Sequence, residues 1–159
     1  AGHMETRVGS GCLLMAYTHV AHDCVLGNRV ILANNASLAG HVTISDNVIF
    51  GGLAGVHQFC RVGRHAFIAG GGMVAQDVPP FCIAQGDRAL LVGINVVGLK
   101  RSGFSRDQIQ AVRQAFKQLF LARSTRLLAL ETVEQGLAVK SPLVKELTEF
   151  VRGSDRGVC

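Results

Sequence analysis

The sequence lacks tryptophan, contains no CxxC pair and has no run of eighteen or more apolar residues. Without such a run, a membrane-spanning helix is not expected. Because the five cysteines show no paired spacing, they predict neither a zinc knuckle nor a disulfide framework, and they indicate the reducing cytoplasm. Charged residues make up only 17% and apolar residues 48%, so the chain is expected to fold rather than to remain disordered.

The N-terminus carries no recognisable signal peptide, because Ala1-Gly2-His3-Met4 resembles the remnant of a cloning tag. A length of 159 residues predicts one domain, or one domain with a helical appendage. We expect a tag remnant and leader over residues 1–7, a repeat domain over 8–79, a loop-rich connection over 80–104 and a helical subdomain over 105–159.

The net charge of +5 comes from basic residues that are spread along the chain without a dense block. Such a distribution is typical of a solvated surface, and it also suits an anionic partner or a phosphorylated ligand. Nucleic acid is not favoured, because no platform of interleaved aromatic and basic residues is present.

Apolar residues recur at every sixth position from Val8, across twelve consecutive hexads and without an insertion. This period matches neither the 3.6 residues of an α-helix nor the two residues of a plain strand. The fifth position of each hexad is also small or β-branched. The pattern is typical of the hexapeptide repeat of a parallel β-helix. The first positions are Val8, Leu14, Val20, Leu26, Leu32, Leu38, Ile44, Phe50, Val56, Val62, Ile68 and Val74.

Strand alternation explains this rhythm, because the fifth position of one hexad and the first position of the next point to the same side. We expect these positions to fill the interior, the sixth and second to face outward, and the third and fourth to form a corner. Three strands then close one triangular coil, which stacks on the next at about 4.8 Å. Cys12, Cys24 and Cys60 occupy fifth positions, so we interpret them as packing residues.

Beyond Val78 the repeat stops at two prolines, which cannot continue a strand ladder. Ser105 and Gln108 form a capping box that predicts a helix whose apolar stripe is Ile109, Val112, Phe116 and Leu119. A second helix is expected near 127–137. A third is expected to begin at Ser141-Pro142 and to turn Leu143, Leu147, Phe150 and Val151 inward, and the tail from Gly153 is expected to be loose.

Three histidines, His22, His41 and His57, lie in the third, sixth and ninth hexads. Because three hexads make one coil, successive coils place them on one side of the prism. His22 and His41 lie at a corner about 5 Å apart in height, and His57 follows on the adjoining strand, about as far again. His19 lies just before this corner, whereas His65 lies on another face and is interpreted as structural.

The histidines predict general-base chemistry, because imidazole titrates near neutrality. Asp23, which adjoins His22, is suited to fix the tautomer of that ring. Gly40 leaves a backbone N–H open to an oxygen on which negative charge develops. No serine or cysteine stands in a nucleophile elbow, so we expect direct attack by the hydroxyl of a substrate.

The segments around these residues resemble a known family. "HVAHDCVLGNRVILANNASLAGHV", "GVHQFCRVG", "AQDVPPF" and "GLKRSGF" are similar to the UDP-N-acetylglucosamine O-acyltransferases that begin lipid A synthesis in Gram-negative bacteria. The resemblance implies a left-handed parallel β-helix followed by a C-terminal helical subdomain, in a cytosolic homotrimer whose sites lie between neighbouring β-helices. It also implies that an (R)-3-hydroxyacyl chain passes from the phosphopantetheine of acyl carrier protein to the 3-hydroxyl of UDP-N-acetylglucosamine, without a metal.

The resemblance assigns roles to individual residues. His22 is implied as the general base, Asp23 as its orienting partner and the Gly40 N–H as the oxyanion donor. Gly70 is implied as the position that measures the length of the acyl chain, and a small residue there would allow a longer chain. The remaining implied contacts are His19, His41, His57 and Gln58 in the cleft for the sugar and the pantetheine, Asn95 and Arg101 at the nucleotide, and Lys100 and Arg101 for acidic partners.

The chain departs from the family at Val97, where close relatives carry a carboxylate, and at Ser102, where many carry a second arginine. It resembles the C-terminal part of the enzyme, because further coils precede this segment in family members. The expectation is that the isolated piece keeps the base, binds substrate poorly and associates through its first coil beyond the trimer.

Two other functions stay open at this point. One is a non-catalytic trimeric scaffold, or a module that binds sugar nucleotide or acyl carrier protein. The other is a zinc site, because γ-class carbonic anhydrases set three histidines between left-handed β-helices. Asp23, Gln58 and "GLKRSGF" favour acyl transfer. The sequence fixes neither the length of the acyl chain nor whether the acceptor is the ordinary sugar or a 3-amino analogue.

Overall fold

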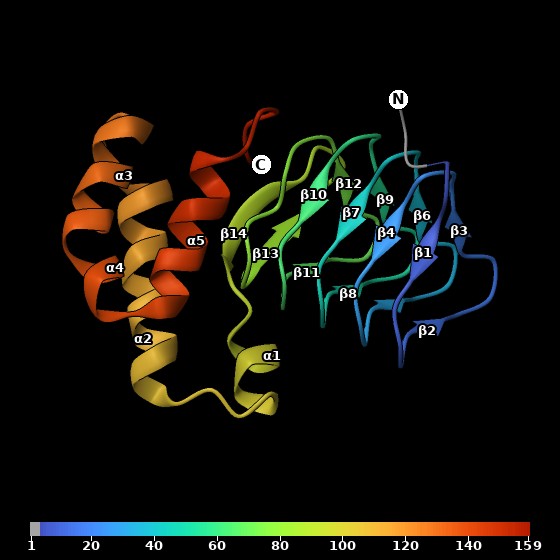
Figure 1. The fold of residues 1–159 in the computed structure, drawn as a ribbon, viewed down its shortest axis with the longest axis horizontal. Coiled ribbons are helices and arrows are strands. Elements are labelled where there is room, and N and C mark those ends of the chain that lie inside the picture. The colour runs from blue at the N-terminus through green and yellow to red at the C-terminus, as the bar shows by residue number, and fades with distance from the viewer. Residues whose placement is uncertain (1–3) are drawn as a thin grey trace.

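A computed structural model describes residues 4–159, and Figure 1 shows a column of short parallel strands followed by a group of helices. Each strand of the column joins the sixth position of one hexad to the first position of the next. The strands are β1 (Arg7–Val8), β2 (Leu13–Leu14), β3 (His19–Val20), β4 (Val25–Leu26), β5 (Ile31–Leu32), β6 (Ser37–Leu38), β7 (Thr43–Ile44), β8 (Ile49–Phe50), β9 (Gly55–Val56), β10 (Arg61–Val62), β11 (Phe67–Ile68) and β12 (Met73–Val74).

The strands form three parallel sheets, so the predicted three-sided β-helix is confirmed. Face A contains β1, β4, β7 and β10, face B contains β2, β5, β8 and β11, and face C contains β3, β6, β9 and β12. Arg7 pairs with Val25 and His19 pairs with Ser37, a step of eighteen residues in both cases. A coil of three hexads therefore stacks in register on the next coil.

From Cys24 on, the first and fifth positions fill the interior as predicted, whereas Val8 and Leu14 of the first coil are 47% and 43% exposed. Leu32, Ile44 and Phe50 are almost completely buried, and Cys24 and Cys60 lie beside them with no exposed surface. Cys12 is half-buried against the same core, so the interpretation of these cysteines as packing residues agrees with their burial. Each large aliphatic or aromatic side chain buried in this way contributes about 1.5–3 kcal/mol by leaving water.

The corners depend on one backbone conformation that the sequence pattern did not reveal. The fourth position of every hexad from Gly11 to Gly71 has a positive φ, between 54° and 68°. Non-glycine residues adopt this left-handed region at a cost, and asparagine, aspartate and histidine tolerate it best. Asp23, His41 and Asn47 occupy such positions, so part of the polar character of the corners has a backbone cause.

The connection over 80–104 is more regular than predicted. It contains β13 (Cys82–Gln85), which extends face B in parallel with β11, and β14 (Leu90–Ile94), which pairs with β13 in the antiparallel direction. A short helix, α1 (Val96–Arg101), follows. The prediction of a loop-rich segment was wrong because these strands lack the period of six and gain their order by pairing with the end of the column.

The helical part is built from α2 (Arg106–Phe116), the π-helical turn η1 (Lys117–Leu121), α3 (Arg126–Gln135), α4 (Leu137–Lys140) and α5 (Pro142–Arg152). The predicted capping box is present: the Ser105 side chain accepts from the Gln108 N–H, and the Gln108 side chain accepts from the Ser105 N–H. Most of the predicted inward residues are buried, whereas Phe150 is only half-buried and lies beneath the guanidinium of Arg61. The buried ones are Ile109, Val112, Phe116, Leu119, Leu143, Leu147 and Val151.

The prediction of a loose tail after Gly153 was wrong. The Asp77 N–H donates to the Gly157 carbonyl at 3.0 Å, and the Cys159 N–H donates to the Asp77 carbonyl at 3.0 Å. Asp77 and Val158 form a parallel bridge. The tail therefore lies against the last coil, because an edge strand offers unpaired backbone groups to any segment that reaches it.

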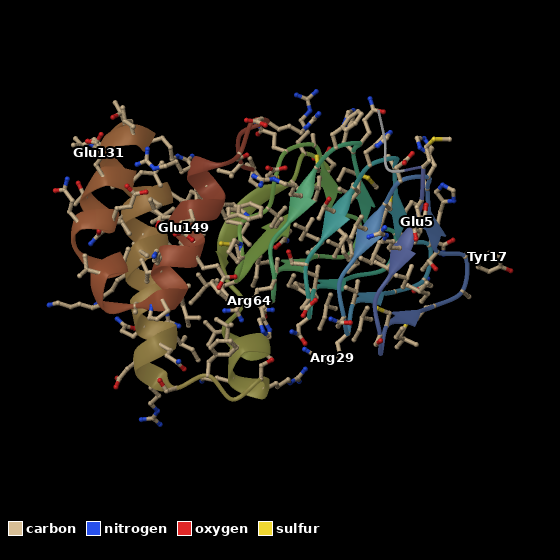
Figure 2. The ribbon with its side chains drawn as sticks, viewed as in Figure 1. Glu5, Tyr17, Arg29, Arg64, Glu131 and Glu149 are labelled. Carbon is tan, nitrogen blue, oxygen red and sulfur yellow. The ribbon has the colours of Figure 1, made fainter. Side chains whose placement is uncertain are left out.

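The column and the helices are joined by a bidentate ion pair, in which Arg64 donates to Glu146 through two bonds of 2.7 Å. Figure 2 shows Arg64 between the two parts.

At the other end, β1 begins at Arg7, inside the predicted leader, and residues 1–3 of the expected tag remnant lie outside the described residues. Over residues 4–159, none of the helices has the length and apolar character needed to cross a membrane.

We predict that Phe50→Ala lowers the free energy of unfolding by about 3–5 kcal/mol, because it leaves a cavity in the narrow interior. Urea denaturation followed by circular dichroism measures the change. Thr43→Ala, at an exposed sixth position, is the matched control and is expected to change the free energy by less than about 0.5 kcal/mol. Equal losses for the two variants would contradict the assignment of inward and outward positions.

We predict that the thiols of Cys24, Cys60 and Cys82 resist alkylation in the native protein at pH 8. Burial raises the pKa of the Cys60 thiol to about 11, and it also raises the pKa of Cys24 and of Cys82. The reactive thiolate is therefore scarce at these residues. Half-buried Cys12 is the internal control, and mass spectrometry after iodoacetamide treatment should detect its label first.

Candidate active site

A dyad of histidine and carboxylate lies at the corner between faces C and A. His22 Nδ1 and Asp23 Oδ2 are 2.9 Å apart. We call the corner residues His22, Asp23, Gly40, His41, Gln58 and Phe59 the histidine corner. A carboxylate at Nδ1 keeps the proton on that nitrogen and leaves Nε2 as the basic nitrogen. The His22 side chain is 73% exposed, so a substrate can reach Nε2, whereas that of Asp23 is only 13% exposed.

Asp23 is held on several sides. Its Oδ1 accepts from the Met4 N–H at 2.6 Å, and its Oδ2 lies 3.8 Å from His41 Nε2. The hydrogen bond with His22 is the main reason why the pKa of the Asp23 carboxyl lies below its ordinary value. The carboxylate therefore stays ionised throughout the pH range in which imidazole changes its charge.

Stacking of coils brings the other members of the corner together. The rings of His22 and His41 are 5.0 Å apart between centroids, which agrees with the predicted step of one coil. The His41 ring stacks on Phe59 at 4.6 Å and an angle of 10°. Phe59 was missed by the sequence analysis, although its place eighteen residues after His41 puts it at the same position of the next coil.

Gly40 is required at this corner for a steric reason. A Cβ at this residue would lie 2.7 Å from Cε1 and 2.8 Å from Nε2 of His22. The Gly40 carbonyl accepts from the Phe59 N–H, whereas the Gly40 N–H donates to no atom of residues 4–159. Gly40 thus lies directly against the ring that carries the basic nitrogen, and its N–H remains available as an oxyanion donor.

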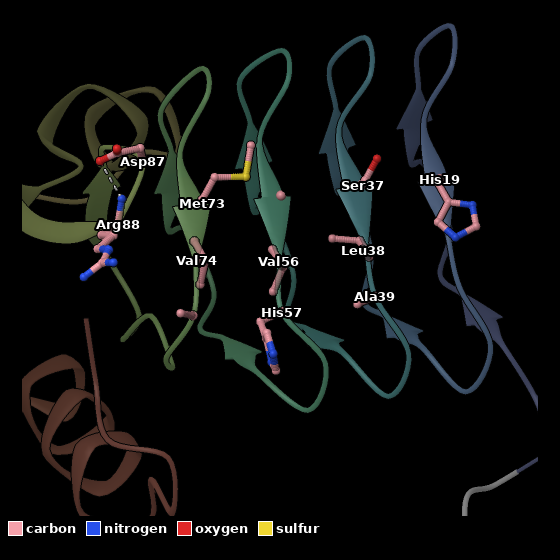
Figure 3. A pocket seen from close by; sticks show the side chains of 12 residues that line it. His19, Ser37, Leu38, Ala39, Val56, His57, Met73, Val74, Asp87 and Arg88 are labelled. Atoms are coloured by element: carbon pink, nitrogen blue, oxygen red, sulfur yellow. Dashed lines mark hydrogen bonds between the residues drawn. The ribbon is translucent and has the colours of Figure 1, made fainter.

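A groove of about 540 Å³ runs along the outside of face C (Figure 3). His19 lies at one end, Asp87 and Arg88 lie at the other, and His57 lies on its edge. The side chains between them are mostly apolar and small, so the groove suits an extended molecule with few charges. The middle is lined by Ser37, Leu38, Ala39, Gly55, Val56, Met73, Val74 and Ala75.

Asn95 and Arg101 lie elsewhere, in a pocket of about 420 Å³ between face B and α1. The Asn95 side chain caps α1 by accepting from the Gly98 N–H at 3.0 Å, and it donates to the His65 carbonyl at 2.9 Å. Arg101 is exposed beside it. Within one chain, the structure therefore does not bring the predicted nucleotide residues to the histidine corner.

The same pocket is lined by Val97 and Ser102, the two residues at which the sequence departs from the family. Val97 is 60% exposed, and the Ser102 hydroxyl lies 3.5 Å from His65 Nδ1. His65 is buried between Phe81 and Phe104, and this burial lowers its pKa, so its predicted structural role agrees with its surroundings. Gly70 lies at the corner between faces B and C and lines neither pocket, and a Cβ there would meet the Gly52 backbone, its oxygen at 3.4 Å and its nitrogen at 4.0 Å.

His22, Asp23 and His41 also form a group with metal-ligand character. One ligand atom from each residue lies within 4.8 Å of the other two. Both rings approach the same carboxylate oxygen, with His22 Nδ1 at 2.9 Å and His41 Nε2 at 3.8 Å from Asp23 Oδ2. The short contact of His22 Nδ1 with the carboxylate is the arrangement of an oriented base.

Comparisons with known proteins identify the family. The family model described as UDP-N-acetylglucosamine O-acyltransferase, domain 2, matches residues 77–159, and the bacterial transferase hexapeptide model matches residues 5–40. The chain belongs to the UDP-N-acetylglucosamine O-acyltransferase family.

Individual relatives of the family extend the match over nearly the whole chain. An acyl-[acyl-carrier-protein]–UDP-N-acetylglucosamine O-acyltransferase of a Janthinobacterium species is 47% identical over 96% of this chain and 60% of the relative. One from Aliarcobacter butzleri is 44% identical over 99% of this chain and 60% of the relative. The solved UDP-N-acetylglucosamine acyltransferase from Campylobacter jejuni has a TM-score of 0.92 at 41% identity, covering 99% of this chain and 61% of that one. The chain thus spans about three fifths of the length of these family members.

We predict that His22→Ala raises the pKa of the Asp23 carboxyl toward the ordinary value of about 3.9, because the variant removes the main hydrogen bond that stabilises the carboxylate. Carbon-detected NMR titration of the aspartate carboxyls measures the shift. Asp46, whose pKa is lowered mainly by the Asn28 N–H at another corner, is the internal control and should not change. An unchanged Asp23 titration would show that the dyad does not form in solution.

Proposed function

We propose that this chain carries the catalytic base of an acyltransferase that moves an (R)-3-hydroxyacyl chain from acyl carrier protein to the 3-hydroxyl of UDP-N-acetylglucosamine. This reaction is the first step of lipid A synthesis and takes place in the cytoplasm. The observation that carries the proposal is the dyad of His22 and Asp23 with Gly40 packed against the ring of His22. The names of the relatives support the donor and the acceptor.

In the proposed reaction, His22 Nε2 takes the proton of the 3-hydroxyl as the sugar oxygen attacks the thioester carbonyl. The Gly40 N–H receives the negative charge that develops on the carbonyl oxygen. The C–S bond then breaks, and the proton passes from His22 to the leaving thiolate, so the products are the ester and the free thiol of the pantetheine. Asp23 stabilises the imidazolium between the two steps, and the reaction needs no metal or other cofactor.

We assign the groove on face C to the pantetheine and the sugar. His19 and His57 line it, while His41 and Gln58 border it at the histidine corner. Its apolar centre suits the pantetheine chain. Lys100 and Arg101 supply positive charge for the diphosphate and for the acidic carrier protein. Because Gly70 has no side chain, it leaves space for a long acyl chain.

We also propose that the protein acts as a homotrimer. The outward positions of face B are apolar from coil to coil, in Leu13, Ile31, Ile49, Phe67 and Ile83, whereas faces A and C mix polar residues with Val25, Gly55 and Met73 at the same positions. An apolar face of this kind is suited to contact with a second copy. The pocket of Asn95 and Arg101 adjoins face B. If face B contacts a second subunit, this pocket can complete the site on face C of that subunit.

We predict that His22→Gln reduces acyl transfer by about 10²–10⁴-fold while binding of the nucleotide sugar is retained, because the variant removes only the base. A radiolabelled transfer assay and isothermal titration calorimetry measure the two quantities. Asn34→Gln, at the same hexad position of another corner, is the matched control and should transfer at the unaltered rate.

Two outcomes would contradict the proposal. Undiminished transfer by His22→Gln would remove His22 as the base. Binding of the nucleotide sugar without transfer, in the unaltered protein as well as in the variant, would favour the alternative of a non-catalytic binding module.

A further inference from the structure

The C-terminal segment Gly153–Cys159 is anchored to the last coil through Asp77, which is 1% exposed. Asp77 Oδ1 accepts from the Arg61 N–H at 2.7 Å, and Oδ2 accepts from Arg61 Nε at 3.0 Å and from the Ser154 hydroxyl at 2.9 Å. The Arg61 guanidinium also donates to the Gly153 carbonyl at 2.6 Å. A buried carboxylate with this many donors fixes the segment in one place, because each donor would otherwise lose its partner.

This anchor delivers one side chain to the edge of the groove. The Gln76 side chain donates to the Arg156 carbonyl at 3.0 Å and holds the backbone at that residue. The Arg156 guanidinium then reaches across, with Nη2 lying 3.4 Å from the Ala75 carbonyl and 3.2 Å from His57 Nδ1. Arg156 and His57 are ninety-nine residues apart in the sequence.

His57 Nδ1 therefore has two neighbours with opposite demands. A guanidinium only donates, so it requires a lone pair on Nδ1. The Gln58 carbonyl lies 3.1 Å from the same nitrogen, and it only accepts, so it requires a proton there. The two contacts select different tautomers of the ring, and the charge of Arg156 gives its hydrogen bond the greater strength.

We propose that Arg156 is a positioning residue that holds His57 in the tautomer with Nδ1 unprotonated and the hydrogen on Nε2. His57 then presents an N–H donor to a molecule in the groove, whereas His22, whose Nδ1 faces a carboxylate, presents a lone pair. The cation at Nδ1 of His57 thus makes that ring a hydrogen-bond donor at Nε2, whereas the carboxylate at Nδ1 of His22 makes that ring an acceptor at Nε2. The consequence for catalysis rests on the proposed acyl transfer, but the tautomer itself does not.

The test is a long-range ¹H–¹⁵N NMR spectrum of the full chain labelled at histidine, with His57 assigned by its loss in His57→Gln. In the unaltered protein we expect Nδ1 to resonate as an unprotonated nitrogen and Nε2 as a protonated one. Arg156→Leu should move the ring toward the opposite tautomer, because the Gln58 carbonyl is then the stronger partner. Arg156→Lys keeps an obligate donor and should restore the original pattern.

Arg152→Leu is the matched control, because Arg152 is an exposed arginine of α5 that pairs with Glu134 rather than with the groove. It should leave the His57 signals unchanged. A protonated Nδ1 in the unaltered protein, or identical His57 signals in Arg156→Leu, would overturn the proposal. Arg156→Leu could act by releasing the tail, which altered backbone signals of Gly157 and Cys159 would reveal. In that case Arg156→Lys decides: if it restores the tail but not the tautomer, the proposal is overturned as well.

The catalytic arm measures kcat and KM for acyl transfer in the same variants. Arg156→Leu is expected to lower kcat by roughly tenfold, the equivalent of one charge-assisted hydrogen bond. Arg156→Lys should recover most of this loss. If the unaltered chain shows no transfer, the proposed function fails in this arm while the NMR result still decides the role of Arg156.

Discussion

The structure depends on one constraint, the parallel pairing of each strand with the strand eighteen residues later. A hydrogen-bonded ladder in register fixes the height of every residue relative to its counterpart in the next coil, as for His19 and Ser37. Because the side-chain period within each strand is two, a slip by one residue would turn the buried aliphatic positions outward. The hydrophobic rhythm therefore sets the register, and the register sets the distances in the candidate site. The 5.0 Å between the rings of His22 and His41 is a consequence of this stacking.

The corners add a second requirement on the same residues. The fourth position of each hexad takes the left-handed conformation, so Asp23 and His41 serve the turn and the site together. This double use explains why the dyad joins adjacent residues: the turn brings the Asp23 carboxylate against the ring of the residue before it. It also explains why Gly40 is needed, since the third position of the next coil lies against that ring. The chemistry at the corner thus uses geometry that the coil needs for its own closure.

The repeat, the inward positions and the gathering of the histidines could be predicted from the sequence, because all three follow from a local period. The capping box at Ser105 and the helix that begins at Pro142 could be predicted for the same reason. The strands β13 and β14 could not, since neither carries the period of six and β13 is ordered by an existing sheet edge. Phe59 was missed because an aromatic residue at a corner has no distinctive local pattern, although the step from His41 would have located it.

The tail shows where reasoning from a local pattern ends. Its residues, from Gly153 to Cys159, have no periodicity, and their order comes from partners near Asp77 that are far away in the sequence. A buried carboxylate requires several donors, and at Asp77 these come partly from the distant tail, so the need for a partner becomes visible only once the burial of Asp77 is known. Because the tail is fixed there, Arg156 lies at the edge of the groove beside His57. No local pattern in the sequence predicts this contact. Long-range polar contacts of this kind add to the site what the repeat cannot supply, because a repeat places the same type of neighbour beside each coil, whereas two histidines with different roles need different neighbours.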